Sequence, residues 1–438
     1  MKYFLAIDFG ATSGRHILGH YENGELKLQE IYRFPNKLIE NNGHLYWNLN
    51  KLIQDMLEGI KKCNDLNIVP ESISIDTFGV DYVLLDEADK LIRDVYCYRD
   101  NRTQSAKEEF HHLMPVERLY QITGVYPQVF NTLYQLFDDK KQGLLSQTKT
   151  IMFLPCYLTY LLTGTKYNEL SIASTSGLLN IDNYNYDEEI LNLLGLNKNI
   201  FSPFMPVGST IGKLKKEIAD YVGFNCDVKV SFHHDTGAAV KGAEVKYNEL
   251  FLSSGTWSLI GVFLNKSNTS KEALNKGFTN ELNDKNEVRF LKNIIGMYLV
   301  TRVKDENTPA LSYGEIVDLA EKGTNYKEIF DATDDRFLAP KNMTEEINNY
   351  FKENNIKEPQ NINELYYCIY HSLARSYKKA IEEIENLTNQ KYVVLKIFGG
   401  GSQNKFLNKL TEQETKLKIV VGPSEATAIG NLLVQAGK

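Results

Sequence analysis

Apolar residues and small turn-forming residues alternate over the first twenty positions in the manner of a β-hairpin. Strand-like stretches over 4–8 and 15–20 flank the turn Phe9-Gly10-Ala11-Thr12-Ser13-Gly14. Two short strands joined by this turn are expected, because glycine accepts the positive φ that hairpin turns need. A further strand is expected over 26–34. Residues 49–60 place apolar side chains three and four positions apart, which predicts an amphipathic helix.

The second half of the chain opens with the same pattern as the first. Residues 251–260 again form an apolar run, a turn of Gly, Ser and Thr, and a second apolar run. We interpret the chain as two α/β domains, 1–243 and 244–438, each beginning with such a hairpin. Chance recurrence of a short pattern explains the local similarity about as well.

The pattern of apolar and turn-forming residues predicts further elements. Strands are predicted at 73–76, ending in Asp76, and at 83–85, after the turn Thr77-Phe78-Gly79. Near the end of the chain, the pattern predicts a long helix over 365–387, a strand over 393–398 and a helix bearing Phe406, Leu407 and Leu410. Residues 265–286 and 331–358 are rich in Lys, Asn and Asp, which predicts solvated loops and surface helices.

Composition narrows the class of protein. Of 438 residues, 42% are apolar and 24% charged, as in ordinary folded proteins, and the formal charge of 49 − 56 = −7 argues against nucleic-acid or anionic-membrane binding. No apolar run approaches the ~20 residues of a membrane span, and Asp8 interrupts the N-terminal apolar stretch too early for a signal peptide. Five cysteines without close pairing suggest reduced thiols. A cytoplasmic protein is expected.

The N-terminal turn has the chemistry of an anion site. Its backbone N–H groups and the hydroxyls of Thr12 and Ser13 suit phosphate oxygens, and Arg15 adds a planar cation. Asp8 would face the same phosphates, which makes sense if Mg²⁺ lies between them. The alternative is a turn that needs glycine for its φ angles alone.

Two common nucleotide-binding motifs are absent or incomplete in this chain. The chain has no G-x-x-x-x-G-K-[ST], so a P-loop is excluded. Gly399-Gly400-Gly401 follows a predicted strand and opens a helix, but it lacks the third glycine of a dinucleotide fingerprint. Close approach of a nucleotide and a tight strand-to-helix turn both explain these glycines.

Asp235 is the strongest candidate for a catalytic base. It lies where a β-branched run gives way to small helix formers, at a strand end or near a helix start. The helix dipole would stabilise its anion and make it a weak base, suited to accepting a proton late in phosphoryl transfer. Alternatively, Asp235 or Thr236 caps the helix. Zinc binding by the preceding His233 and His234 is disfavoured, because adjacent side chains on a strand point to opposite faces.

A third cluster, Tyr98-Arg99-Asp100-Asn101-Arg102-Thr103, places two arginines around a carboxylate. Such a run fits the recognition of a polyol and equally a surface ion-pair patch.

Taken together, nine segments in this order resemble the FGGY family of carbohydrate kinases, in the actin/Hsp70/sugar-kinase superfamily. The resemblance implies an α/β fold of two RNase-H-like domains facing a central cleft. The segments are 6–15, 75–81, 98–103, 130–136, 234–236, 252–259, 291–296, 399–404 and 422–431.

The resemblance also implies an ATP- and Mg²⁺-dependent kinase acting on a ketose, with L-rhamnulose the first candidate and L-fuculose or L-xylulose as alternatives. Asp235 would accept the proton from the C1 hydroxyl, and Asp8 would help to place Mg²⁺. The sugar would be bound by Gly79, His234, Asp235, Thr236 and Asn293. ATP would be bound by Ala11, Thr12, Ser13, Gly14, Arg15, Thr256, Thr301 and Gly400.

The chain departs from the family pattern at several positions. Phe78 stands where relatives commonly carry Trp, Thr301 where Gln contacts ATP, and Gly237 where a small Ala is usual, a change expected to matter little. The chain also stops at Lys438, where relatives continue with another helix or more. A catalytically silent sugar- or nucleotide-binding regulator on the same fold is the alternative of a different class, although it would need neither Asp8 nor Asp235. A nicotinamide dehydrogenase is disfavoured by the missing fingerprint.

Overall fold

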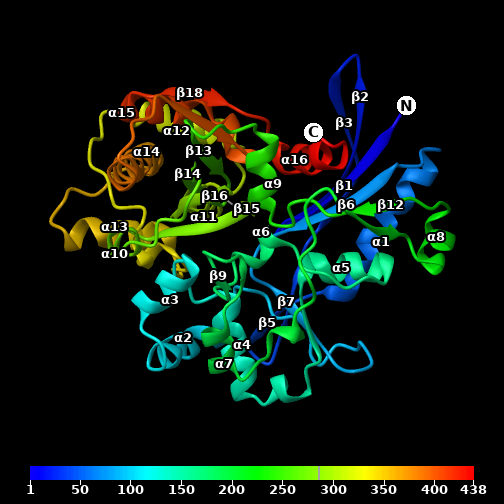
Figure 1. The fold of residues 1–438 in the computed structure, drawn as a ribbon. Coiled ribbons are helices and arrows are strands. Elements are labelled where there is room, and N and C mark those ends of the chain that lie inside the picture. Colours follow the sequence, from blue (N-terminus) through cyan, green and yellow to red (C-terminus); the bar gives the residue numbers. More distant parts are fainter. Residues whose placement is uncertain (285–286) are drawn as a thin grey trace.

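The computed structural model describes residues 1–284 and 287–438, which contain two six-stranded sheets (Figure 1). In the first sheet, β1 (Tyr3–Phe9) pairs antiparallel with β2 (Ser13–Glu22) and parallel with β6 (Ser72–Thr77), and β12 (Asp227–Lys229) continues the parallel part. The order across this sheet is β11 (Thr210–Lys213), β12, β6, β1, β2 and β3 (Glu25–Pro35).

Five strands of the second sheet repeat this arrangement. The antiparallel neighbours β13 (Leu250–Ser254), β14 (Trp257–Leu264) and β16 (Glu287–Ile295) correspond to β1, β2 and β3, and the parallel strands β17 (Val394–Phe398) and β18 (Lys418–Val421) correspond to β6 and β12. The sixth strand differs, because β11 lies beside β12 whereas β15 (Phe278–Asp284) lies beside β16. The order across the second sheet is β15, β16, β14, β13, β17 and β18. The repeated hairpin pattern of the sequence therefore reflects a repeated architecture.

Strand β1 shows why these apolar runs become central strands. Successive side chains of a strand point to opposite faces. Leu5 and Ile7 enter a core with Leu52 of α1 (Leu49–Asp65), whereas Phe4 and Ala6 enter a second cluster on the other face. A strand covered on both faces needs a continuous apolar run, as observed here.

Two helices cross between the sheets. Helix α9 (Asp235–Gly242) follows β12 of the first sheet, but its Ala239 and Val240 pack with Phe251 and Phe398 of the second. Helix α16 (Ala426–Gln435) follows β18 of the second sheet, but its Leu432 packs against the first, with Phe4, Ala6 and Ile17. The two helices lie side by side at the centre of Figure 1.

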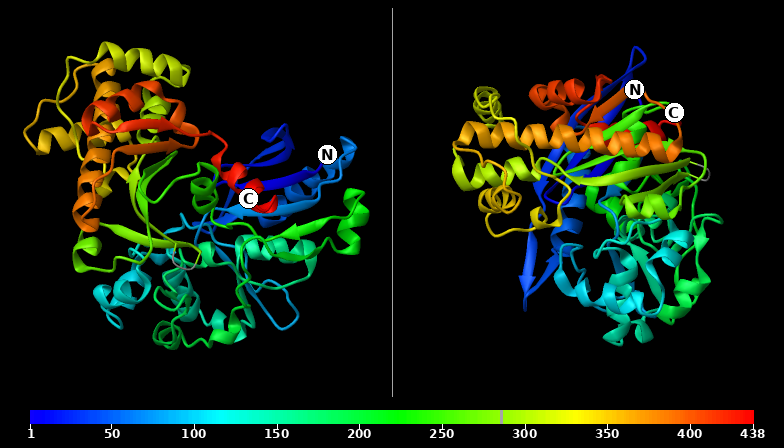
Figure 2. Two further views of the ribbon diagram at one scale, coloured as in Figure 1. Left: turned by 45° about the horizontal axis from the view of Figure 1, so that its top comes forward. Right: turned by 90° about the vertical axis from the view of Figure 1, so that its left-hand side faces the viewer.

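The remaining helices cover the sheets or form the lower part of Figure 1. Figure 2 shows α14 (Ile362–Thr388), the longest helix of the described residues, in orange across the lobe of the second sheet. The helices are α2 (Gln104–His111), α3 (Val116–Thr123), α4 (Thr132–Lys141), α5 (Leu154–Thr163), α6 (Leu170–Ala173), α7 (Glu188–Leu194), α8 (Lys216–Val222), α10 (Lys271–Asn275), α11 (Tyr298–Asn307), α12 (Tyr313–Lys322), α13 (Met343–Glu353), α14 (Ile362–Thr388) and α15 (Lys405–Thr415).

Smaller elements complete the fold. Three two-stranded sheets pair β4 (Leu38–Asn41) with β5 (His44–Trp47), β7 (Tyr82–Leu85) with β8 (Thr150–Phe153), and β9 (Leu179–Asn180) with β10 (Asn185–Tyr186). Short 3₁₀ helices span Asn101–Thr103, Leu144–Gln147, Lys198–Ile200, Asp335–Phe337 and Gly400–Gln403. Across 1–284 and 287–438, we find no helix with the length and apolarity needed to cross a bilayer.

Most predicted elements are confirmed, including both hairpins, the helix at 49–60 and the long helix at 365–387. The stretch 331–358 contains the surface helix α13, as predicted. The prediction of solvated loops over 265–286 is wrong for 278–284, which form the buried strand β15; residues 285 and 286 lie outside the described residues. Its polar side chains are buried because the first half of the chain covers them: Asn280 Nδ2, for example, donates to the carbonyl oxygen of Gly124 at 2.9 Å.

Candidate active site

One cavity lies between the two sheets and collects most of the residues predicted from the sequence. The hairpin tips of both sheets reach it, through Ala11 and Thr12 on one side and Thr256 on the other. The predicted sugar-binding residues also line it: Gly79, His234, Asp235, Thr236 and Asn293. Residues that lie 282 positions apart in the sequence, from Ala11 to Asn293, thus share one cavity.

Asp235 is the first residue of α9, as predicted for a helix start. Its Oδ1 accepts hydrogen bonds from Thr236 N at 2.5 Å and from Thr236 Oγ1 at 3.1 Å. His234 Nε2 lies 3.4 Å from the same oxygen.

The expectation that Asp235 is a weak base is corrected by its surroundings. Burial raises the pKa of its carboxyl above the ordinary range, and the charge of Asp8 raises it further, against the opposing effect of His234 and the Thr236 hydrogen bonds. The helix dipole alone would lower this pKa. Desolvation in the cavity wall outweighs it, so Asp235 is a stronger base than its helix position suggests.

A buried ion pair from the second sheet reaches His234, and no sequence pattern predicts this contact. Glu281 of β15 and Arg289 of β16 are cross-strand partners, with Arg289 Nη2 3.2 Å from Glu281 Oε2. The same Nη2 lies 3.2 Å from His234 Nδ1, and Glu281 Oε2 lies 3.3 Å from that nitrogen. The sequence pattern does not single out Glu281, because its strand is polar enough to resemble a loop.

His233 has a structural environment, unlike its neighbour. It is fully buried, with Nδ1 2.6 Å from the carbonyl oxygen of Ile75 and Nε2 2.6 Å from the Tyr167 hydroxyl. Both ring nitrogens of His233 therefore have partners within the chain. Within the described part of the chain, no cluster of three or more His, Cys, Asp or Glu side chains is arranged to hold a metal ion.

Arg15 is held by carboxylates on two sides. Its Nη2 lies 2.9 Å from Asp8 Oδ2, across the β1–β2 pair, and its Nη1 lies 2.7 Å from Glu425 Oε2, immediately before α16. Burial alone would lower the pKa of Arg15, but Asp8 and Glu425 raise it above its usual value. Arg15 does not line the cavity.

Asp8 and Asp76 end neighbouring parallel strands in register, β1 and β6. Asp76 is fully buried, and its Oδ2 accepts from Asn431 of α16 at 2.6 Å. Its Oδ1 finds no hydrogen-bond partner in the described residues. Burial and the adjacent Asp8 raise the pKa of Asp76 well above the ordinary range. Two neighbouring carboxyl groups fit the needs of Mg²⁺, which takes one or two carboxylates and completes its shell with water and phosphate.

Gly14 has a packing role in this structure rather than a place in the cavity. A Cβ atom there would lie 2.1 Å from Phe34 Cζ, so any side chain would displace that ring. The turn itself closes through a 3.0 Å hydrogen bond from Gly10 N to the Ser13 carbonyl oxygen. Of the five predicted phosphate-binding residues, Ala11 and Thr12 line the cavity.

An aromatic wall closes part of the cavity. Phe78 and Tyr98 line it, and Trp47 stacks behind Phe78 with ring centroids 4.3 Å apart. Asp81 fixes this wall by accepting from Trp47 Nε1 at 2.6 Å, from Tyr98 N at 3.0 Å and from Gln135 Nε2 at 3.1 Å. The ring at position 78 is therefore backed by an indole from β5, which sequence spacing does not reveal.

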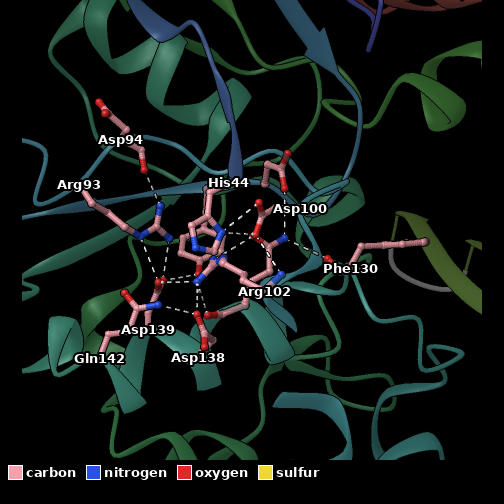
Figure 3. A network of polar contacts seen from close by, with 12 residues as sticks. His44, Arg93, Asp94, Asp100, Arg102, Phe130, Asp138, Asp139 and Gln142 are labelled. Carbon is pink, nitrogen blue, oxygen red and sulfur yellow. Dashed lines mark hydrogen bonds and ion pairs between the residues drawn. The ribbon is translucent and has the colours of Figure 1, made fainter. Parts of the chain in front are cut away.

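The arginine-rich segment 98–103 divides between two roles. Tyr98 and Arg99 line the cavity, whereas Arg102 is buried below it. Figure 3 shows the guanidinium of Arg102 next to Asp138 and Asp139, and Arg93 next to Asp139. Arg102 Nη1 lies 2.9 Å from Asp138 Oδ2 and 2.8 Å from Asp139 Oδ1, and Arg93 Nη2 lies 2.7 Å from Asp139 Oδ2. The prediction of a polar ligand site fits Tyr98 and Arg99, the first two residues of this segment. The prediction of an ion-pair patch fits Arg102, although its ion pairs are buried rather than exposed.

Comparison with known proteins identifies the family. Residues 3–242 match the N-terminal domain of the FGGY family of carbohydrate kinases, and residues 250–437 match its C-terminal domain. The chain belongs to the FGGY carbohydrate kinase family. Its similarity to a rhamnulokinase from Oceanobacillus iheyensis is 41% identity over 433 residues, covering 98% of this chain and 92% of the relative. A rhamnulokinase from Bacillus subtilis is 39% identical over 434 residues, covering 99% and 89%.

Solved structures of kinases have the same fold as this chain. Ligand-bound xylulose kinase from Lactobacillus acidophilus superposes with a TM-score of 0.84 at 17% identity, covering 99% of this chain and 89% of that one. Plasmodium falciparum glycerol kinase with ADP gives 0.81 at 16% identity, with the same coverage. The two-domain, actin-like α/β fold expected from the sequence is confirmed.

Two further residues predicted to bind ATP, Gly400 and Thr301, lie outside the cavity lining, as do Ser13, Gly14 and Arg15. Gly400 is exposed, and a Cβ atom there would meet open space; its neighbour Gly401 approaches Ser254, at the end of β13. Thr301 lies on α11, where its hydroxyl is 2.9 Å from the Tyr313 hydroxyl. Gly400 thus lies next to the second hairpin, and the hydroxyl of Thr301 already has a partner within the chain.

Proposed function

We propose that this FGGY kinase transfers the γ-phosphoryl group of ATP to the C1 hydroxyl of L-rhamnulose, giving L-rhamnulose 1-phosphate. The support for this substrate is that relatives called rhamnulokinase are 36–41% identical over 98–99% of the chain. Kinases named for other sugars are similar at 13–17% identity, which carries the fold alone.

The observation that carries a catalytic function is the position of Asp235. A carboxyl with a raised pKa lines a cavity that two hairpin tips also enter. Phosphoryl transfer needs chiefly positioning and charge neutralisation. As the sugar hydroxyl attacks phosphorus, Asp235 would accept its proton, and its raised pKa suits that step near neutral pH.

The ketose would lie against the first-domain side of the cavity. His234 and Thr236 flank the base, and Gly79 lies beside His234: a Cβ atom on Gly79 would be 3.4 Å from His234 Nε2. Asn293 adds an amide from β16. Side chains from both sheets would thus contact one sugar, and closure around it would exclude water from the phosphoryl group.

ATP would enter from the hairpin side. Ala11 and Thr12 of the first hairpin and Thr256 of the second line the cavity, and the Gly400 segment borders the second hairpin. Ser13, Gly14 and Arg15 would form the frame of the first turn behind this lining, and Arg15 would add a guanidinium there. Mg²⁺, held by Asp8 with Asp76 beside it, would supply charge neutralisation for the phosphates.

A non-catalytic regulator is the competing proposal from a different class. A binding protein has no use for a half-buried base of raised pKa, nor for the neighbouring carboxyls of Asp8 and Asp76. Both features favour an enzyme.

A ketose-panel assay tests the proposal. Purified protein with ATP and Mg²⁺ is expected to release ADP with L-rhamnulose faster than with L-fuculose, L-xylulose or L-fructose, the last being L-rhamnulose with a hydroxyl added at C6. ³¹P NMR of the product should place the phosphate on C1. Preference for another ketose would overturn the substrate, and no turnover across the panel would favour the silent binder.

A further inference from the structure

Arg289 is a fully buried cation with no part in the family motifs. It projects from β16 beside Glu281, which neutralises it. Its Nη2 faces three acceptor groups: Glu281 Oε2 and His234 Nδ1, each at 3.2 Å, and the Leu282 carbonyl oxygen at 3.5 Å. A buried guanidinium is costly unless it is paired, so its direct contact with an active-site histidine calls for a reason.

Gly237, in the first turn of α9, lies next to this guanidinium. A Cβ atom at Gly237 would lie 3.5 Å from Arg289 Cζ, an ordinary contact, and 3.0 Å from Asn283 Oδ1, which would have to shift slightly. The expectation that glycine at this position matters little therefore stays a prediction.

The surroundings of His234 favour one tautomer. Arginine is always a donor, so the 3.2 Å contact with Arg289 is attractive only when His234 Nδ1 carries a lone pair. On the other side of the ring, Nε2 faces Asp235 Oδ1 at 3.4 Å, which is attractive only when Nε2 carries hydrogen. Protonation of Nδ1 would favour Glu281 alone and would point an N–H at the guanidinium. Two contacts therefore favour the Nε2–H form, and one opposes it.

We propose that Arg289 is a positioning residue: it holds His234 as the neutral Nε2–H tautomer, so that this N–H points to Asp235 and the sugar site. The role of that N–H rests on the proposed function. A ketose oxygen would accept from His234 while the adjacent hydroxyl donates to Asp235, which aligns the attacking group. The long apo distance between His234 and Asp235 leaves room for this, since such contacts tighten when substrate binds.

The neighbouring His233 provides an internal reference. A carbonyl oxygen can only accept, so its 2.6 Å contact with Ile75 requires hydrogen on Nδ1 of His233, and the Tyr167 hydroxyl then donates to Nε2. Burial lowers the pKa of His233 to about 4, which keeps it neutral at pH 7. Two adjacent histidines are thus expected in opposite tautomers.

The test is ¹⁵N NMR of histidine-labelled protein, which separates N–H from lone-pair nitrogens in the ring and recognises the imidazolium. Signals are assigned by the variants His233→Asn and His234→Asn. At pH 7 the wild type should show hydrogen on Nε2 of His234 and on Nδ1 of His233. In Arg289→Met, Glu281 should draw a proton to His234 Nδ1, while His233 stays unchanged. In Glu281→Gln, Arg289 still donates, and His234 should keep the wild-type pattern.

Kinetics supply a second readout. Arg289→Met should lower kcat/KM for the ketose by about 10- to 100-fold, as expected for loss of a hydrogen bond with a charged partner, while KM for ATP stays unchanged. Equal losses toward ATP and the ketose would indicate a structural role only and would contradict the proposal.

Two spectra would overturn the proposal: a protonated Nδ1 on His234 in the wild type, or an unchanged Nε2–H form in Arg289→Met. If Arg289→Met fails to fold, the wild-type spectrum still tests the tautomer, because hydrogen on Nδ1 of His234 would overturn the proposal. The tautomer is read without turnover, so failure of the proposed substrate leaves this measurement intact.

Discussion

Gly242 of α9 and Gly430 of α16 bring the backbones of two helices from opposite halves of the chain into direct contact. A Cβ atom on Gly430 would lie 1.8 Å from the Ala238 carbonyl oxygen, and one on Gly242 would lie 1.9 Å from that of Ala426. Any side chain at this crossing must separate the helices. Since Asp235 begins α9, the crossing also fixes the candidate base.

Gly430→Ala is therefore expected to destabilise the fold and slow catalysis together. Overpacking of a tight contact costs about 1–3 kcal/mol in free energy of unfolding, measurable by urea denaturation. The matched control is Gly314→Ala on α12, where the nearest atom is 3.8 Å away and the residue is exposed. Unchanged stability and kcat in Gly430→Ala would show that the helices can adjust.

Asp235→Asn should lower kcat by roughly 10²–10⁴, the range for a general base, while ATP still binds in a calorimetric titration. Asp227→Asn, at the half-buried first residue of β12, where the side chain pairs with Lys213, is the control and should retain wild-type turnover. Wild-type kcat in Asp235→Asn would mean that the proton goes to another group.

The pH profile of kcat/KM follows from the same residue. Asp235 acts only when deprotonated, and burial raises its pKa. The rate should therefore fall on acidification at a pH above the ordinary aspartate range of about 4. An acid limb at or below that range would show that the base is not desolvated.

Arg15→Ala should raise KM for ATP more than KM for the ketose. It removes the cation beside Asp8 and leaves the phosphate side of the site more negative. Arg33→Ala, the exposed cross-strand neighbour of Arg15, is the control. An effect confined to KM for the ketose would show that the first hairpin contacts the ketose rather than ATP.

Asp81 should make stability pH-dependent. Burial raises its pKa to about 6, although Trp47, Gln135 and Tyr98 hydrogen bonds oppose this. The folded state therefore holds a proton that the unfolded chain, with a pKa near 3.9, releases sooner, so stability falls as pH rises from about 4 to 6. The contribution is at most about 3 kcal/mol. Asp81→Asn should abolish this part of the pH dependence of the free energy of unfolding, measured by urea denaturation at several pH values. An unchanged pH dependence would assign it to another group.

The sequence predicts those features that are local. Gly-rich turns, the helix start at Asp235 and the family motifs all lie within short segments. Glu281 and Arg289 escape because their partner, His234, comes from the other half of the chain, and because β15 has no apolar alternation. The basicity of Asp235 escapes for the same reason: desolvation depends on what covers a residue, which only the assembled fold determines.

The exchange of helices between the sheets bears on how the chain is made. Strand β1 stays without its cover until α16 has been synthesised; Gln435, which donates to the Leu5 carbonyl oxygen, follows it by 430 positions. At 5–20 residues per second the wait is roughly 20–90 s. For that time Phe4, Ala6 and Ile17 face water on the ribosome, a surface that chaperones and aggregating neighbours would both recognise.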